Sequence, residues 1–168
     1  MLKIVKTLSI QIMLIFGVSQ LSSQSNAQTI SGALDDLERG KIAKALKDLK
    51  NLADKGDRDA SYLLGDIYVN GWSVKQNDKE AMKWFRISSK LGNPDAQFKL
   101  GVLYVEGNNI TQDVKKAYLW VYISQKELEE NYVGKHLAAI EKKISPPEVL
   151  RLKREAERCI AENYKICD

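Results

Sequence analysis

The 168-residue sequence is poor in the residue types that most often carry chemistry. It contains one histidine, His136, and two cysteines. It lacks the Gly-x-Ser-x-Gly motif of hydrolases, the phosphate-binding Walker loop and the His-Glu-x-x-His zinc motif. Two cysteines eight positions apart and a single histidine do not fit common zinc spacing. These absences argue against an enzyme and against a bound metal or other cofactor, and they favour a structural role for His136.

Charge of one sign is not concentrated in any part of the chain. The 26 basic and 22 acidic residues are interspersed, with a formal net charge of +4. The lysines of Lys41–Lys55 are interrupted by Asp48 and Asp54, as on a solvated helix face rather than in a phosphate-binding patch. The sequence therefore shows no electrostatic footprint for nucleic acid.

No apolar run reaches the roughly 20 residues of a membrane span. The longest apolar run lies near the start of the sequence. Lys3 and Lys6 precede the apolar stretch Leu8–Val18, and small residues stand at the end of Ser25–Ala27. This layout predicts a secretory signal peptide over residues 1–27, because a membrane span needs about 20 apolar residues. We expect a periplasmic or secreted protein with no stable membrane anchor after cleavage. The alternative is a retained anchor helix.

A pattern written twice dominates the middle of the chain. Nine positions recur at one fixed spacing of 36 residues. The first copy has Ala60, Leu64, Gly65, Tyr68, Gly71, Val74, Asn77, Ala81 and Trp84. The second has Ala96, Leu100, Gly101, Tyr104, Gly107, Ile110, Asp113, Ala117 and Trp120. A period of this length is the signature of a solenoid, in which stacked hairpins bury the apolar faces that one hairpin leaves exposed.

Each copy predicts two helices. Gly71 and Gly107 end the first helix, since glycine accepts left-handed dihedrals, and a side-chain oxygen of Asn77 or Asp113 caps the second. A mid-helix glycine, as at Gly65, costs roughly 1 kcal/mol relative to alanine. That cost is tolerable where a bare backbone lets the neighbouring helix approach closely.

These residues resemble the Sel-one-like repeat, a relative of the tetratricopeptide repeat. The chain departs from the family pattern at Ser73 and Asn109 in the loops, at Ser88-Ser89, and at Leu128 in place of a closing glycine. Serine adopts a left-handed dihedral less readily than asparagine, so the loop at Ser73 is expected to differ in shape. The resemblance implies an all-α, right-handed α-solenoid of helix-turn-helix repeats with about eight helices and a C-terminal capping helix.

The domain organisation follows from this register. Residues 28–168 form a single solenoid, with an N-terminal capping hairpin at 28–56, repeats at 57–92 and 93–128, and C-terminal capping helices at 129–168. The last helix starts at Ser145–Glu148, which has the form of a capping box with proline in the first turn.

The two cysteines predict a disulfide, because an even count in an exported chain favours pairing. Cys159 and Cys167 would lie about 12 Å apart along a continuous helix, whereas a disulfide needs Cα atoms roughly 4.4–6.8 Å apart. The chain is therefore expected to leave the helix around Asn163 and fold back.

The resemblance implies a non-catalytic protein-interaction module, an adaptor or inhibitor of the bacterial cell envelope, that binds a protein or peptide in its concave groove. Phe98, Val102 and Val105 lie opposite the buried stripe of their helix, and Tyr62 matches Phe98 in the first repeat. We expect these residues, with Trp72 of the loop, to form the partner-binding strip. The alternatives are burial against the next repeat and, for Trp72, folding back onto the hairpin.

A second function remains open on the same resemblance. Cysteine-rich Sel-one-like proteins pair cysteines at a similar spacing and are linked to penicillin binding, which implies an enzyme or binder acting on the cell wall or on β-lactams. Their bridges recur in every repeat, whereas this chain has one candidate pair. A secreted effector is a third possibility.

Overall fold

The computed structural model describes residues 29–107 and 110–167, so the expected signal segment and the loop position Asn109 lie outside the described residues. Within these ranges all regular secondary structure is helical, in eight helices, as the sequence predicts. They are α2 (Ile30–Glu38), α3 (Ile42–Asp54), α4 (Arg58–Asn70), α5 (Asp78–Lys90), α6 (Pro94–Glu106), α7 (Val114–Ser124), α8 (Glu130–Glu141) and α9 (Pro146–Ala161).

The chain divides into two compact units after residue 48, inside α3, and the described residues of the first unit are 29–48. In the first unit, Thr29 caps α2 by accepting a hydrogen bond from the amide of Gly32 at 3.1 Å. The largely buried carboxylate of Asp36 accepts a hydrogen bond from Lys44 of α3, and Lys41 lies 3.6 Å away. The Lys44 ammonium lowers the pKa of Asp36, so the carboxylate stays ionised and links the two helices.

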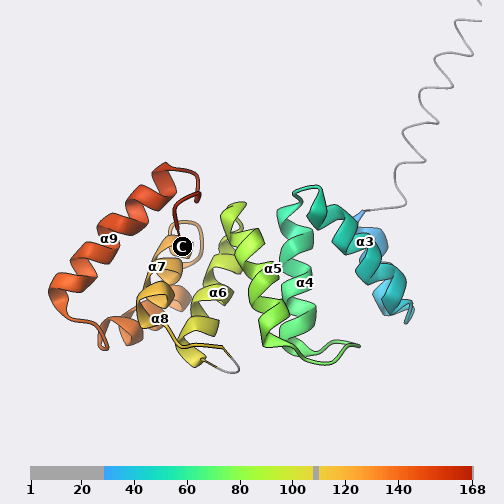
Figure 1. Cartoon of the computed structure of the whole chain (residues 1–168), viewed down its shortest axis with the longest axis horizontal. Helices are drawn as coiled ribbons and strands as arrows, with labels where there is room; N and C mark the ends of the chain where they lie inside the picture. Colours follow the sequence, from blue (N-terminus) through green and yellow to red (C-terminus); the bar gives the residue numbers. More distant parts are fainter. Residues whose placement is uncertain (1–28, 108–109, 168) are drawn as a thin grey trace, which may run out of the picture. The chain divides into compact units, whose positions relative to one another are not determined.

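In the second unit, α4 and α5 form one hairpin and α6 and α7 form the next, standing side by side in Figure 1. A Cβ atom on Gly65 would lie 2.6 Å from the ring of Phe85, and one on Gly101 would lie 2.5 Å from Val121 Cγ2. The expected close approach of the paired helices at these glycines is confirmed. Trp84 and Trp120 are both buried.

The expected helix ends are also confirmed. Gly71 and Gly107 close α4 and α6 with left-handed dihedrals, at φ values of 68° and 65°. Asn77 caps α5 by accepting from the amide of Glu80 at 3.1 Å, and Asp113 caps α7 in the same way. In both repeats, the loop between the two helices therefore starts at a left-handed glycine and ends at a side chain that caps the next helix.

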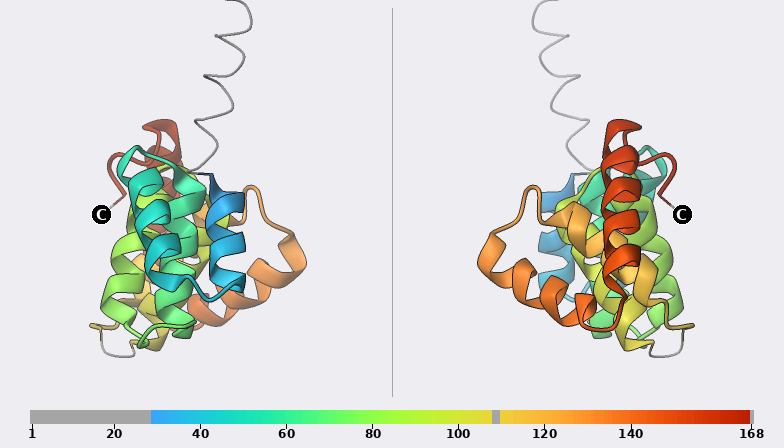
Figure 2. Two further views of the ribbon diagram at one scale, coloured as in Figure 1. Left: turned by 90° about the vertical axis from the view of Figure 1, so that its right-hand side faces the viewer. Right: turned by 90° about the vertical axis from the view of Figure 1, so that its left-hand side faces the viewer.

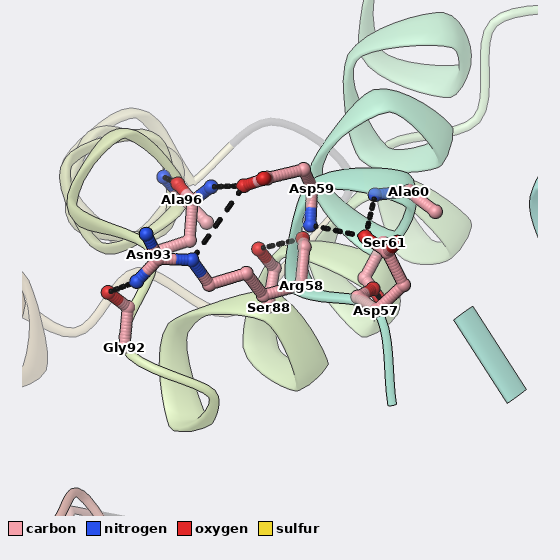
Figure 3. Close-up of polar contacts among 9 residues, drawn as sticks. All are labelled: Asp57, Arg58, Asp59, Ala60, Ser61, Ser88, Gly92, Asn93 and Ala96. Carbon is pink, nitrogen blue, oxygen red and sulfur yellow. Dashed lines mark hydrogen bonds and ion pairs between the residues drawn. The ribbon is translucent and has the colours of Figure 1, made fainter. Parts of the chain in front are cut away.

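A set of polar contacts joins the start of α4 to the turn between α5 and α6 (Figure 3). The Asn93 side chain accepts from the amide of Ala96 at 2.9 Å and donates to Asp59 at 2.8 Å. Arg58 donates to the Gly92 carbonyl at 2.9 Å, and the buried hydroxyl of Ser88 donates to the Arg58 carbonyl at 2.7 Å. The second repeat is thus fixed to the first by hydrogen bonds as well as by apolar packing.

Asn93→Ala is expected to lower the free energy of unfolding by about 2 kcal/mol, at the upper end for loss of a helix cap. The alanine removes the α6 cap and leaves Asp59 without one of its donors. Urea denaturation followed by circular dichroism measures the change. Asn77→Ala is the matched control, because the exposed Asn77 side chain makes the cap bond to Glu80 and no other hydrogen bond within the described residues. Equal losses in the two variants would contradict a role for the Asn93–Asp59 bond.

Beyond the second repeat, α7 packs against both α8 and α9. Both views of Figure 2 show α8 standing out to one side of the row formed by α4–α7. The prolines open α9 as expected, but the expected capping box is wrong. The Ser145 side chain makes no cap hydrogen bond, and Glu148 binds Arg151 at 2.8 Å and Lys115 of α7 at 2.7 Å instead. The cations offer Glu148 stronger, charge-assisted partners than a backbone amide does.

This arrangement predicts a pH dependence of stability. Arg151, and then Lys115, lower the pKa of Glu148 from its ordinary 4.5 to about 2. Since the folded pKa is depressed, the contribution of Glu148 to stability is present above pH 4.5 and is lost as the pH falls toward 2. The difference in unfolding free energy between wild type and Glu148→Gln should therefore shrink between pH 5 and pH 2. A difference that stays constant over this range would contradict the assignment.

Candidate partner-binding surfaces

The five residues expected to bind a partner all lie in the unit of residues 49–168, but the structure does not join them into one strip. Tyr62 is on α4, Phe98, Val102 and Val105 are on α6, and Trp72 is in the loop after α4.

Phe98 is buried, at 6% exposure, so its expected exposed position is wrong. Its ring packs on two residues of α8, with centroids 5.1 Å from Tyr132 and 5.0 Å from His136. The His136 ring stands edge-on to Phe98. The reason is that Tyr132 and His136 of α8 lie against this end of α6. The alternative of burial is therefore correct for Phe98. The contact of His136 with Phe98 agrees with a structural role for this histidine.

Further along α6, Val102 and Val105 are half-buried and line a hollow of about 160 Å³. Val121 of α7 and Ala139 and Ile140 of α8 complete its apolar wall. Its remaining lining residues are Glu106, His136 and Lys143. A hollow of this size accepts one or two apolar side chains, with charged groups of both signs at the rim.

Tyr62 lies half-buried on α4, with its ring 5.9 Å from that of Phe85. Burial, and then the carboxylates of Asp66 and Asp95, raise the pKa of its hydroxyl to about 12. Lys99 of α6 lies 3.6 Å from Asp66, so the first helices of the two repeats share an ion pair beside this tyrosine. The hydroxyl is neutral at physiological pH and suits hydrogen bonding.

Trp72 is 55% exposed, and it does not fold back into the hairpin core. The next residue, Ser73, adopts a left-handed φ of 59°. Serine thus takes the backbone conformation that suits the glycine of the family pattern, at a cost in strain of order 1 kcal/mol. An exposed tryptophan on a sharply turned loop remains a candidate contact residue.

The C-terminal segment is hooked back by the Cys159–Cys167 disulfide, with Cα atoms 5.3 Å apart. The chain turns at Asn163 and Tyr164, both at positive φ, as expected from the cysteine spacing. Both cysteines are buried in the core, and the Tyr164 ring packs so closely on Gly92 that a Cβ there would lie 2.9 Å away. The segment after α9 is therefore held against the end of α9, and its Tyr164 also covers the turn between the repeats.

Cys159→Ser/Cys167→Ser is expected to lower the unfolding free energy by about 2–3 kcal/mol, the amount expected for a short closed loop. Reduction of the wild-type protein should produce a similar loss, measured by thermal unfolding with and without a phosphine reductant. Tyr164→Ala is the control for packing of the segment alone. If reduction leaves the midpoint unchanged, the disulfide does not stabilise this end.

A basic hollow of about 680 Å³ opens at the loop end of the hairpins, and sequence reasoning missed it. Lys79 and Arg86 of α5 and Lys116 of α7 contribute three cations. The other lining residues are Met82, Tyr104, Gly107, Ile110, Thr111 and Asp113. One signal was available in the sequence: Lys79, Met82 and Arg86 share one face of a helix at the i, i+3, i+7 spacing. Lys116 belongs to the next repeat, and only the fold brings it there.

Side chains able to bind a metal ion are not clustered in the described residues. Among them no cluster of three or more histidine, cysteine, aspartate or glutamate side chains is placed to bind a metal. No described helix combines the length and apolar character needed to cross a bilayer. The candidate binding features of the described residues are surfaces formed by paired helices, loops and hollows.

The comparison with protein families bears directly on this geometry. The model of the Sel1 repeat matches residues 58–93 and 94–122, which are the two hairpins described above. The chain contains two Sel1 repeats. The Sel1 match thus covers the four helices α4–α7, and the other described helices lie outside the match.

Solved structures show the same Sel1-repeat fold. The protective antigen c5321 of uropathogenic Escherichia coli, which displays an SLR fold, aligns with a TM-score of 0.70 and 19% identity, over 88% of this chain and 34% of its own. A Sel1 repeat protein from Oxalobacter formigenes aligns with a TM-score of 0.57 and 21% identity, over 77% of this chain and 55% of its own. This chain thus spans about a third to a half of these proteins. Curated protein sequences give no significant match.

Proposed function

We propose that the protein is a non-catalytic interaction module of the bacterial cell envelope, an adaptor or inhibitor that binds a partner polypeptide. The observation that carries the proposal is the apolar hollow between α6 and α8, built on a Sel1 repeat. Repeat solenoids present extended concave surfaces that bind partners.

On this proposal the partner binds in the groove of α6 and α8. Val102 and Val105 form the floor of the groove, and Tyr62 of α4 lies beyond it. Phe98 supports α8 from beneath and does not touch the partner. An apolar side chain of the partner would fill the 160 Å³ hollow, and its polar neighbours would meet Glu106 and Lys143 at the rim. Such a buried anchor inside a polar rim is typical of interaction hot spots.

Export to the envelope forms part of the proposal. The basic and apolar start of the sequence supports it, and so does the disulfide, since such bonds persist in oxidising compartments. N-terminal sequencing of the protein purified from the periplasm should begin at Gln28. Intact Met1 in the mature pool would contradict export by cleavage.

The binding role is tested by covalently crosslinking the mature protein to its partner in the cells that produce it. Ala139→Glu places a charge in the mouth of the hollow at an exposed position, and should reduce the crosslinked partner at least about tenfold. Leu150→Glu, an exposed apolar residue of α9, is the matched control. Thermal unfolding must be equal in both variants. A partner retained by Ala139→Glu at the wild-type level would overturn the proposed face.

The non-catalytic assignment has its own test. The purified mature protein should give no turnover of nitrocefin or of peptidoglycan above a heat-denatured sample. Turnover that survives repeated purification would favour the enzyme alternative.

A further inference from the structure

We propose that the basic hollow at the loop end is a second contact site, which takes the carboxylates of an acidic, extended segment of the partner polypeptide. This inference rests on the proposed function, and it names the chemistry of one part of the partner. The hollow is lined by residues of α5 and α7, by Tyr104 of α6 and by Gly107, Ile110 and Thr111, and it shares no lining residue with the groove of α6 and α8.

Two of the three cations are held in place by the fold. Arg86 donates to the Tyr104 hydroxyl at 2.6 Å, and Lys116 stands over the ring of the same tyrosine, 5.7 Å from its centroid. Tyr104 is 5% exposed and anchored in the core, so it orients both cations from below. These two contacts fix where the charges of Arg86 and Lys116 lie.

Lys79 and Lys116 are the cations of this hollow that are available to an incoming carboxylate. Within the described part of the chain, neither Lys79 nor Lys116 forms an ion pair. The lining carboxylate is Asp113. It caps α7 by accepting hydrogen bonds from the amides of Lys115 and Lys116 at 3.1 and 3.0 Å. Its charge is directed to the helix terminus. An incoming carboxylate therefore meets cations in this hollow.

The shape and lining favour a peptide over a small anion. A volume of about 680 Å³ exceeds what an isolated phosphate or sulfate needs, and Met82 and Ile110 add apolar wall between the cations. A second hollow of about 520 Å³, lined by Lys75 and Gln76 among others, adjoins it at Lys79. Carboxylates alternating with apolar side chains along an extended chain match this arrangement.

The test uses two synthetic peptides and the mature, disulfide-intact protein labelled with ¹⁵N. One peptide, acetyl-Glu-Leu-Asp-Glu-Ile-Asp-amide, carries the acidic pattern, and the other replaces each acid by its amide. The acidic peptide should shift the resonances of Arg86 and Thr111 in a saturable manner, and the amide peptide should not. Raising the salt from about 50 to about 300 mM should weaken binding several-fold.

Lys79→Gln/Lys116→Gln should weaken binding of the acidic peptide about fivefold to tenfold. The control is Lys135→Gln/Lys142→Gln, which removes the same charge from exposed positions at α8. Equal weakening by both pairs would show that only net charge matters, and would overturn the proposal. So would shifts confined to the groove of α6 and α8, or equal affinity for inorganic phosphate or for phosphatidylglycerol vesicles.

The crosslinking experiment separates this inference from the proposed function. If Lys79→Gln/Lys116→Gln captures the partner as well as wild type does, the acidic-segment site is wrong and the interaction module stands. If no partner is captured by wild type, the proposed function fails, while the peptide titration still decides whether the hollow binds carboxylates.

Discussion

Gly101→Ala should destabilise the protein by about 2–3 kcal/mol, although alanine is the better helix former. On an isolated helix the change would be stabilising by roughly 1 kcal/mol. In the fold, the new methyl group would lie 2.5 Å from Val121 Cγ2 and 3.1 Å from the Ala117 carbonyl oxygen. The carbonyl belongs to the backbone of α7, so the two helices must move apart. Overpacking of this kind typically costs about 1–3 kcal/mol, and here it must exceed the propensity gain.

Urea denaturation of wild type and variant measures this effect. Gly65→Ala is the informative comparison, because the three atoms nearest to its methyl group would all belong to the ring of Phe85, the closest at 2.6 Å. A side chain can turn where a backbone cannot, so we expect the loss at Gly65 to be the smaller of the two. An unfolding free energy of Gly101→Ala equal to or above wild type would show that α6 and α7 are not in close contact.

Phe98→Asp should lower the unfolding free energy by about 3 kcal/mol or more. Truncating a buried phenylalanine costs about 3–5 kcal/mol, and a carboxylate placed against Tyr132 and His136 adds a desolvation cost. The ring is 6% exposed and joins α6 to α8, so its loss should also detach α8. Hydrogen exchange should then show faster exchange in α8 than in α4 and α5.

The matched control is Trp72→Asp. This tryptophan is 55% exposed in a loop, and its replacement should leave the unfolding free energy within about 0.5 kcal/mol of wild type. If Phe98→Asp melted like wild type and lost partner capture, Phe98 would be a contact residue and α8 would not cover it in solution.

The repeat in the sequence was sufficient to predict the hairpins because its signals are local. Leu64, Leu100 and the two tryptophans set the buried faces, and Gly71 and Gly107 set the ends through their own backbone preferences. The disulfide was predictable on the same basis. Cys159 and Cys167 would be too far apart to bond on a straight helix, and the chain does turn at Asn163.

The candidate sites were predicted less well, because each depends on a neighbour that the local pattern does not specify. The positions of Phe98 and Val102 on α6 are equally apolar, and the path of α8 decides which is buried and which lines a hollow. Glu148 has the sequence position of a capping residue, yet Lys115 of α7 and Arg151 draw it away from the helix start.

By itself, the sequence determined that the chain forms helical hairpins with a fixed repeat, with close packing at Gly65 and Gly101 and a C-terminus that folds back. These features depend on periodicity, on backbone dihedrals and on covalent reach, all of which act over a few residues. Only the tertiary structure decided that Phe98 is buried, that a basic hollow forms between Arg86 and Lys116, and that Tyr164 covers Gly92. Burial and charge pairing join residues far apart in the chain, and their partners are set by how the helices pack.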